Sequence, residues 1–220
     1  YRRGNFNGSF DQLILDALME VKGTDLILLG WHRPLLNQAA LGGTVSRVLA
    51  EAATAVGVLV DRGLVPGQVS KVLVPFHGTA DDDAALALAF RLARQPQVQV
   101  TVLQVAAPPS PKPPASDAQA KPPQTIAVPP ELLTQVTIKQ VVHKDPAEAA
   151  LAETTVSSVG GYDLVLVGIG SDWGLQQRTF GMSQELFIRR CPASLLIIRG
   201  AATAPRNAAY SPPAVSTASA

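Results

Sequence analysis

The sequence contains very little of several residue types, and each shortage excludes a class of protein. Among its 220 residues there is one cysteine, Cys191, so an internal disulfide framework is excluded, which fits a reducing compartment. Cys191 stands in an apolar stretch beside Pro192, where we expect a small buried side chain, with a reactive thiol as the alternative. No apolar run approaches the ~18–20 residues that a membrane-spanning helix needs.

Charge is also scarce, and neither sign dominates. The formal net charge is +1, and Lys and Arg are scattered without a basic run, so we expect no nucleic-acid partner. The three histidines, His32, His77 and His143, are far apart without ligand-like spacing, so no metal site is predicted. Spacing reveals no Ser-His-Asp, Cys-His or paired-carboxylate pattern, and we therefore predict no catalytic residues and no enzyme activity.

The chain does contain an internal repeat, a pattern of residues that occurs twice. Asp25-Leu-Ile-Leu-Leu-Gly30 leads to Gly43, a helical run and an apolar strand at 58–60. Asp163-Leu-Val-Leu-Val-Gly168 leads in the same way to Gly181, a helical run and a strand at 194–198. The spacing from Asp to the first Gly, and from that Gly to the next, is identical although the loops differ. This repetition indicates a single structural unit used twice.

Alternating strand and helix patterns with short connections predict an α/β fold with a doubly wound parallel sheet. The complete second unit spans 67–200, and the partial first unit, the C-terminal half of the same plan, spans 1–66. We expect the two to pack through their final strands or their flanking helices. The strands are predicted at 25–30, 57–61, 71–76, 98–105, 136–142, 163–169 and 194–199, and the helices at 10–22, from Thr44 as cap to about 54, 81–95, 129–135, from Pro146, and 182–190.

Two further segments differ in composition from the repeated units. Residues 107–130 hold nine prolines with Ala, Ser, Lys and Gln, which predicts an insertion or linker that cannot pack a core. Residues 201–220 are mainly Ala, Ser, Thr and Pro and predict a disordered tail. The chain opens at Tyr1 without an initiator Met, and the first unit lacks its front half. We therefore expect a fragment of a longer protein.

Candidate ligand-binding residues follow the predicted strands, because ligands of open parallel sheets bind at the carboxyl ends of strands. Gly168 ends a strand, and Gly181 opens a helix whose free N–H groups could hold a phosphate, with the hydroxyl of Ser183 nearby. A third strand end supplies His77, Gly78 and Thr79. The first unit offers Gly30, Gly43 and Thr44. The alternative is ordinary turn chemistry without a ligand.

Titratable residues lie close to this predicted site. His77 at a strand end could titrate near neutral pH, and the alternative is a partly buried histidine with satisfied hydrogen bonds. The run Asp81-Asp82-Asp83 falls in the first turn of a predicted helix. Helix capping is the favoured interpretation, ahead of an ion site.

The segment Val74-Pro-Phe-His-Gly-Thr79, an Ala-rich helix after it, and Gly168 to Gly181 together resemble a universal stress protein domain. The resemblance implies an adenine nucleotide as a candidate ligand, because nucleotide-binding members carry a Gly-x2-Gly-x9-Gly-Ser/Thr loop. Here the outer glycines keep that spacing, with Ser171 and Met182 at the remaining positions. His77 stands where such domains place an Asp.

Two longer stretches, Leu49 to Gly63 and Phe76 to Ala93, resemble the soluble C-terminal region of the CHX-type cation/proton exchangers. The resemblance covers residues 10–105 and 136–200. It implies a cytosolic regulatory domain on the cytoplasmic face of a membrane protein, whose upstream transmembrane domain exchanges K⁺ or Na⁺ for protons. Regulation would act through a ligand, pH or a partner.

Two other functions remain open from the sequence. One is a free-standing tandem universal stress protein that binds ATP or AMP. The other is a dimerisation module without a ligand. For the antiporter domain itself we expect a homodimer. No cofactor other than the adenine nucleotide is predicted.

Overall fold

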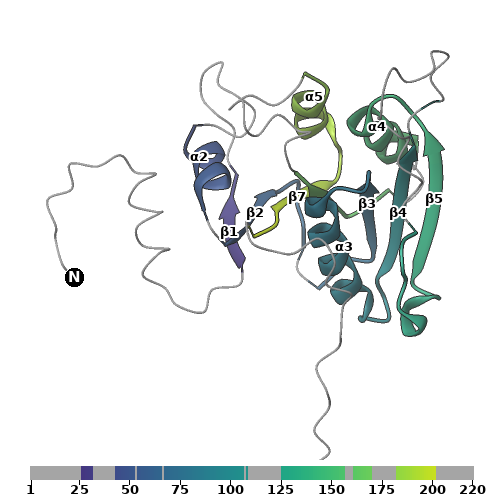
Figure 1. The fold of residues 1–220 in the computed structure, drawn as a ribbon. Coiled ribbons are helices and arrows are strands. Elements are labelled where there is room, and N and C mark those ends of the chain that lie inside the picture. Colours follow the sequence, from purple (N-terminus) through teal and green to yellow (C-terminus); the bar gives the residue numbers. More distant parts are fainter. Residues whose placement is uncertain are drawn as a thin grey trace, which may run out of the picture.

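A seven-stranded sheet organises the part of the chain that the structure, a computed structural model, describes (Figure 1). The described residues are 26–31, 43–52, 54–65, 67–106, 108, 125–156, 161–169 and 182–201. The strand order is β1-β2-β7-β6-β3-β4-β5. The strands are β1 (Leu26–Gly30), β2 (Ala55–Val60), β3 (Lys71–Phe76), β4 (Gln99–Ala106), β5 (Val136–Val142), β6 (Leu164–Gly168) and β7 (Ser194–Arg199).

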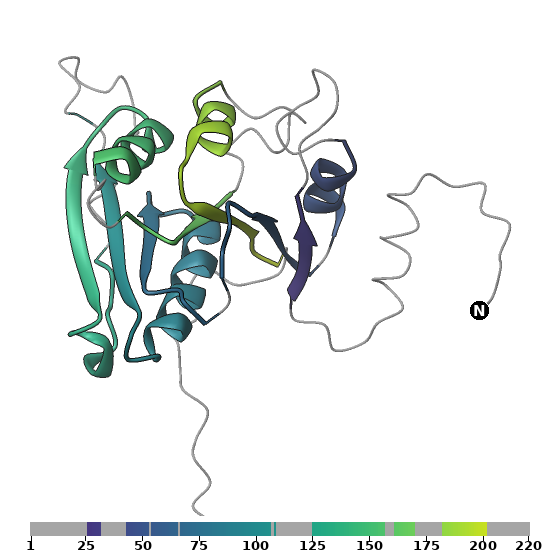
Figure 2. The same cartoon turned by 180° about the vertical axis from the view of Figure 1, so that it is seen from behind.

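Helices cover both faces of this sheet. On one face, α2, α4 and α5 supply Val48, Ala150 and Phe187 to a core with strand residues such as Val165. The other face is covered mainly by α3, which lies in front of the strands in Figure 1 and behind them in Figure 2. The helices are α2 (Gly43–Glu51), α3 (Ala80–Ala93), the 3-10 turn η1 (Pro130–Leu132), α4 (Pro146–Val156) and α5 (Met182–Arg190).

The two copies of the repeated pattern have the same register on their neighbouring strands. Gly30 of β1 stands beside Leu59 of β2, and Gly168 of β6 stands beside Ile198 of β7. The amide that follows each glycine donates to the carbonyl of that same neighbour, Trp31 N to Leu59 O and Ile169 N to Ile198 O, at 2.8 Å each. β1 therefore lies on β2 as β6 lies on β7.

The two units join through their final strands, one of the two arrangements that the sequence left open. Every strand pair of the described sheet is parallel except β2 with β7, which is antiparallel. Val58 pairs with Ile197 at this junction, and the register above makes these two residues equivalent. A local two-fold axis therefore passes between them and relates the units, so the parallel sheet of the prediction is a mixed one.

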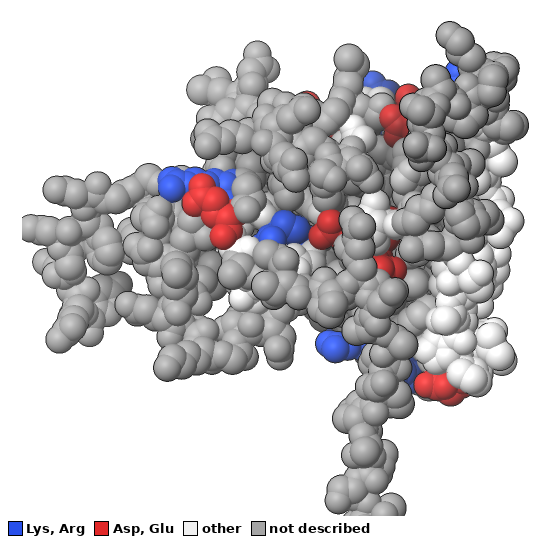
Figure 3. Space-filling model, viewed as in Figure 1, with Lys and Arg blue, Asp and Glu red and all other residues white. Residues whose placement is uncertain are grey.

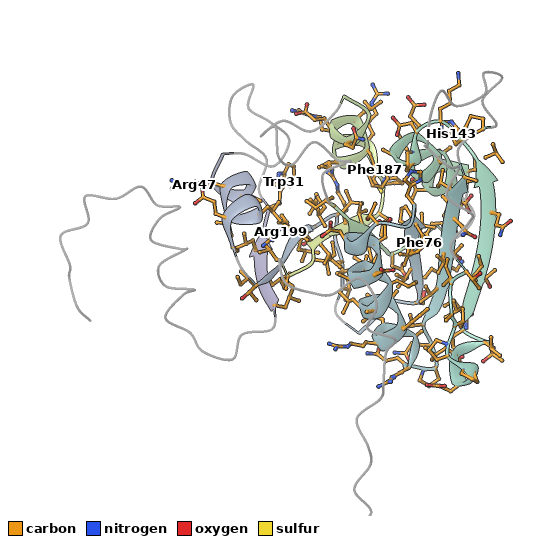
Figure 4. The ribbon with its side chains drawn as sticks, in the orientation of Figure 1. Trp31, Arg47, Phe76, His143, Phe187 and Arg199 are labelled. Carbon is orange, nitrogen blue, oxygen red and sulfur yellow. The ribbon has the colours of Figure 1, made fainter. Side chains whose placement is uncertain are left out.

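Two arginines reinforce the junction, one at each end of it. Arg62, just after β2, donates to the carbonyl oxygens of Ile188 at 2.8 Å and Arg189 at 3.3 Å, in the last turn of α5. Arg199, at the end of β7, donates to the carbonyl oxygens of Ala52 and Thr54, which follow α2 (Figure 4). In each unit an arginine side chain thus contacts the carboxyl end of the other unit's last helix, where the helix dipole is negative.

Most predicted elements are found, but the predicted helix at 129–135 is only the 3-10 turn η1, and two further predictions need correction. α2 begins at Gly43, so Thr44 is its second residue rather than its cap, and it ends at Glu51 rather than near 54. The carbonyl oxygens of Ala52 and Thr54, just beyond it, accept from Arg199. The segment 107–130 was expected to pack no core, yet Ile126 and Val128 pack against the core beneath α3. The predicted helix at 10–22, residues 202–220 and most of 107–124 lie outside the described residues.

Candidate functional site

The carboxyl ends of β3 and β6 bring two of the predicted site segments together. β3 and β6 are neighbours in the sheet, although the chain leaves β3 through α3 toward β4 and reaches β6 through α4 on the opposite face. The connections therefore diverge at this point, as they do where α/β proteins bind ligands. His77, Gly78 and Thr79 follow β3, and Gly168 ends β6.

Gly168 makes this approach possible. A Cβ atom at this position would lie 2.4 Å from backbone atoms of Asp81 and of Asp82 in the first turn of α3. Real side chains do not tolerate such a distance, so the glycine allows α3 to begin directly against β6. The glycine was predicted as a ligand contact, and the structure assigns it a packing role at the same strand end.

The turn between β3 and α3 is held by hydrogen bonds of its own. Gly78 has a φ of 87°, a conformation that glycine adopts without strain. His77 Nδ1 lies 3.2 Å from the carbonyl oxygen of Val105, near the end of β4. This contact ties the imidazole to the neighbouring strand, while the side chain remains exposed.

Asp82 occupies the backbone donors at the start of α3. One of its carboxylate oxygens accepts from His77 N and from Thr79 N, each at 3.0 Å, and Thr79 Oγ1 accepts from Asp82 N at 3.1 Å. The two residues form a capping box, which confirms the capping interpretation of the acidic run. Burial raises the pKa of Asp82, while the hydrogen bonds from Thr79 and His77 act in the opposite direction.

This geometry limits what the turn can bind. The N–H groups of His77 and Thr79 already donate to a carboxylate, and three acidic side chains stand in the first turn of α3. A phosphate placed there would be repelled by these carboxylates. A helix start with free N–H groups would instead offer it hydrogen-bond donors. The start of α5 is the remaining candidate for an anion, and both Gly181 and the side chain of Ser183 lie outside the described residues. Nucleotide binding therefore stays a prediction.

The corresponding residues of the first unit lie elsewhere. Gly30 ends β1 and Gly43 begins α2, at the other end of the sheet from β3. Because β2 runs antiparallel to β7, the strand ends of this unit open toward the opposite edge of the sheet. The structure thus does not combine the two predicted glycine sets into one site.

A cavity among the described residues lies at neither predicted site. Its volume is about 240 Å³, and it sits near the amino ends of β3, β6 and β7. Its polar lining includes Arg62, Gln68 and Asp163. Asp163 Oδ2 already accepts from Ser70 N, Ser70 Oγ and Lys71 N at 2.8–2.9 Å, which fixes the start of β3. The carboxylate of Asp163 therefore serves to hold the start of β3 in place.

Sequence reasoning missed Asp163 and the two junction arginines as contact residues. Burial acts to raise the pKa of Asp163, but its hydrogen bonds from Lys71 and Ser70 prevail, and the pKa lies below the ordinary value. For Asp163 the signal was its repetition at Asp25. Neither Arg62 nor Arg199 belongs to a local pattern that could have indicated its distant carbonyl partners.

On the face seen in Figure 3, the described residues carry charges of both signs, and their Lys and Arg side chains form no continuous stripe there. Cys191 is buried as expected, with 2% of its surface exposed, and this burial raises the pKa of its thiol. Among the described helices, none has the length and apolar character needed to cross a bilayer.

Together these features define an α/β protein with a mostly parallel, doubly wound sheet. A model of the universal stress protein family matches residues 68–199, more than half of the chain, and the chain belongs to this family. Solved structures show the same fold. A universal stress protein from Archaeoglobus fulgidus aligns with a TM-score of 0.58 at 15% identity, covering 87% of this chain and 66% of that one. A putative one from Pseudomonas aeruginosa gives 0.52 at 15%, covering 87% and 69%.

A curated relative is a cation/proton antiporter. The chain is 38% identical over 99 residues to Cation/H(+) antiporter 8 of Arabidopsis thaliana, which confirms the resemblance to cation/proton antiporters. The aligned part is 39% of this chain and 12% of the relative, so the chain spans a small part of that protein's length.

Proposed function

We propose that this chain is the cytosolic regulatory domain of a monovalent cation/proton antiporter that exchanges K⁺ or Na⁺. The observation that carries the proposal is the 38% identity to a cation/proton antiporter over 99 residues. It favours an antiporter domain over a free-standing universal stress protein, because the matching relative is a far longer transport protein. An upstream membrane domain is then the domain's first partner.

The architecture supports a regulatory role. Two units share one sheet, and arginines at both ends of the junction bind the units to each other. A force applied to one unit is therefore transmitted to the other as a movement of the whole sheet. Regulation requires two arrangements with different affinity for a ligand, a proton or a partner, and the regulatory domain biases the membrane domain between them.

The test is a transport measurement on the full-length protein in inside-out vesicles. Cation-driven proton movement is compared between the intact protein and a version without residues 1–220, both inserted to the same level. We expect exchange in both, with a changed dependence of the rate on cytosolic pH or cation concentration in the truncated protein. Identical dependence in the two would contradict the regulatory role.

The antiporter assignment has its own check. The reading frame before Tyr1 should encode a series of apolar spans of about 20 residues each. A stop codon or a water-soluble domain directly upstream would remove the assignment. For the nucleotide, calorimetry with ATP and AMP on the chain and on Gly181→Glu tests the predicted ligand, and binding that the substitution leaves unchanged would contradict that site.

A further inference from the structure

The cavity at the amino ends of β3, β6 and β7 lies where the two units meet. Its wall combines the segment 62–69, which follows β2, with residues at the start of β6 and of β7, among them Asp163 and Ser194. Its volume of about 240 Å³ is below the roughly 300–1,000 Å³ of drug-sized pockets, so it admits a small metabolite. The predicted nucleotide site lies at the opposite ends of β3 and β6.

Two opposite charges line this cavity without neutralising each other. Arg62 and Asp163 both belong to its wall, and they form no ion pair with each other. Burial raises the pKa of Asp163, but hydrogen bonds from Lys71 and Ser70 lower it below its ordinary value, so the carboxylate is charged at neutral pH. Arginine is charged at every physiological pH. A ligand in this cavity therefore meets one cation and one anion.

Both charged groups keep hydrogen-bonding capacity beyond their structural contacts. A guanidinium has five N–H donors on three nitrogens. Both bonds from Arg62 to the carbonyl oxygens of Ile188 and Arg189 come from Nη2, and its guanidinium carbon lies 5.8 Å from the centroid of the Trp31 ring. Within the described part of the chain, Nε and Nη1 thus keep their donors. Likewise, the bonds to the Asp163 side chain all end on Oδ2, which leaves Oδ1 as an acceptor.

The rest of the wall offers apolar surface beside these charges. Leu64, Val69, Pro192 and Ala193 line the cavity together with the side-chain amide of Gln68. Leu64 and Val69 are only partly buried by the core beneath α3, so part of their surface is left for a ligand. Covering apolar surface of this kind favours a ligand with a hydrocarbon group.

We propose that this cavity binds a free α-amino acid with an apolar side chain. The carboxylate of the amino acid accepts two hydrogen bonds from Arg62, a geometry that the planar guanidinium favours. Its ammonium group donates to Oδ1 of Asp163, and its side chain lies against Leu64 and Val69. A ligand with a single charge would leave the opposite charge of the cavity partly desolvated and unpaired, and a zwitterion pairs both. The inference is independent of the transport proposal.

Titration of the 220-residue chain with L-leucine, followed by heteronuclear NMR, tests the site. Two matched probes carry one charge each, since isocaproate lacks the ammonium group and isoamylamine lacks the carboxylate. We expect leucine to shift the amide signals of Gly63, Leu64 and Ala193 in a saturable way, with a Kd of about 1 mM or lower. Each single-charge probe should bind at least about tenfold more weakly. Leucine that shifts none of these signals, or that binds no better than either probe, would overturn the proposal.

Three variants locate the two contacts. Arg62→Met should weaken leucine binding by at least about tenfold. Arg91→Met, the same change at an exposed position in the last turn of α3 and outside the cavity, should leave the binding unchanged. Asp163→Asn should remove the preference for leucine over isocaproate, because the amide no longer attracts the ammonium group.

An unchanged preference in Asp163→Asn, or equal losses in Arg62→Met and Arg91→Met, would contradict the assigned contacts. The comparison of leucine with its two probes is made on the parent chain. It therefore decides the proposal even where a variant fails to fold.

Discussion

β1 and β6 have nearly the same sequence and the same position on their neighbouring strands, but they differ in burial. Leu166 is completely buried, and its counterpart Leu28 is 60% exposed. The local pattern therefore determines that a strand forms and which residues share a face. How much each residue stabilises the protein depends on the strand and helix that pack against it.

The largest expected effect comes from the buried leucine. Leu166→Ala should lower the free energy of unfolding of the 220-residue chain by about 3 kcal/mol, because it leaves a cavity beneath α3. Leu28→Ala should change it by less than about 0.5 kcal/mol, as for other exposed positions. Urea unfolding measures both. Equal losses would show that β1 is covered in the chain alone.

Substitution of the two glycines should repeat this difference, with a larger loss of stability at β6 than at β1. Gly168→Ala should cost about 2 kcal/mol, because the methyl group forces the first turn of α3 away from β6. Gly30→Ala should be neutral within about 0.5 kcal/mol in the 220-residue chain, since its Cβ atom meets nothing within 4 Å among the described residues. Thermal unfolding followed by circular dichroism compares them. A neutral Gly168→Ala would contradict the close contact.

The two junction arginines allow a comparison of the two ends of the junction between β2 and β7. Arg199 is half-buried, and Arg199→Met should destabilise the chain by about 1.5 kcal/mol because two carbonyls lose a charged donor. Arg62 is exposed, so Arg62→Met should cost about 0.5 kcal/mol, since water replaces the lost donor. Denaturant unfolding of both variants checks the order. The reverse order would show that the arginine contact at the α5 end of the junction stabilises the protein more.

The smallest effect depends on pH. The folded-state pKa of Asp163 lies below the ordinary value of 3.8, so its stabilisation is present above that pH and is lost as pH falls through the folded pKa. Asp163→Asn should therefore be less stable than the parent by under about 1 kcal/mol at pH 7, after screening by solvent. The gap should shrink as the pH falls below 3.8. A gap that widens in acid would contradict the assigned hydrogen bonds.

The strands with continuous apolar sequence were predictable from the sequence to the residue. The segments 71–76 and 194–199 are β3 and β7 as predicted, because β-branched and leucine runs bounded by polar residues leave little choice. The contact of Arg199 with the carbonyl oxygen of Thr54, just beyond α2, was not predictable, since the two residues are 145 positions apart in the chain. The antiparallel pairing of β2 with β7 was equally hidden, because either orientation buries the same residues.

The candidate site was predicted in part. The sequence placed His77, Thr79 and Gly168 at strand ends, and the structure brings these strand ends together. It could not show that the carboxylate of Asp82 takes the backbone donors of that turn, because a capping residue and a free acidic residue look alike in sequence. The loop before Gly181 lies outside the described residues, and its part in a ligand site stays a prediction.

The antiparallel junction of β2 with β7 determines how a ligand bound to one unit can affect the other. Turning one unit half a revolution against the other sends the loops after β1 and the loops after β3 and β6 to opposite rims of the sheet. A molecule arriving at one rim touches a single unit. Its influence reaches the far rim through the pairing of β2 with β7 and through the two arginines that cross this junction.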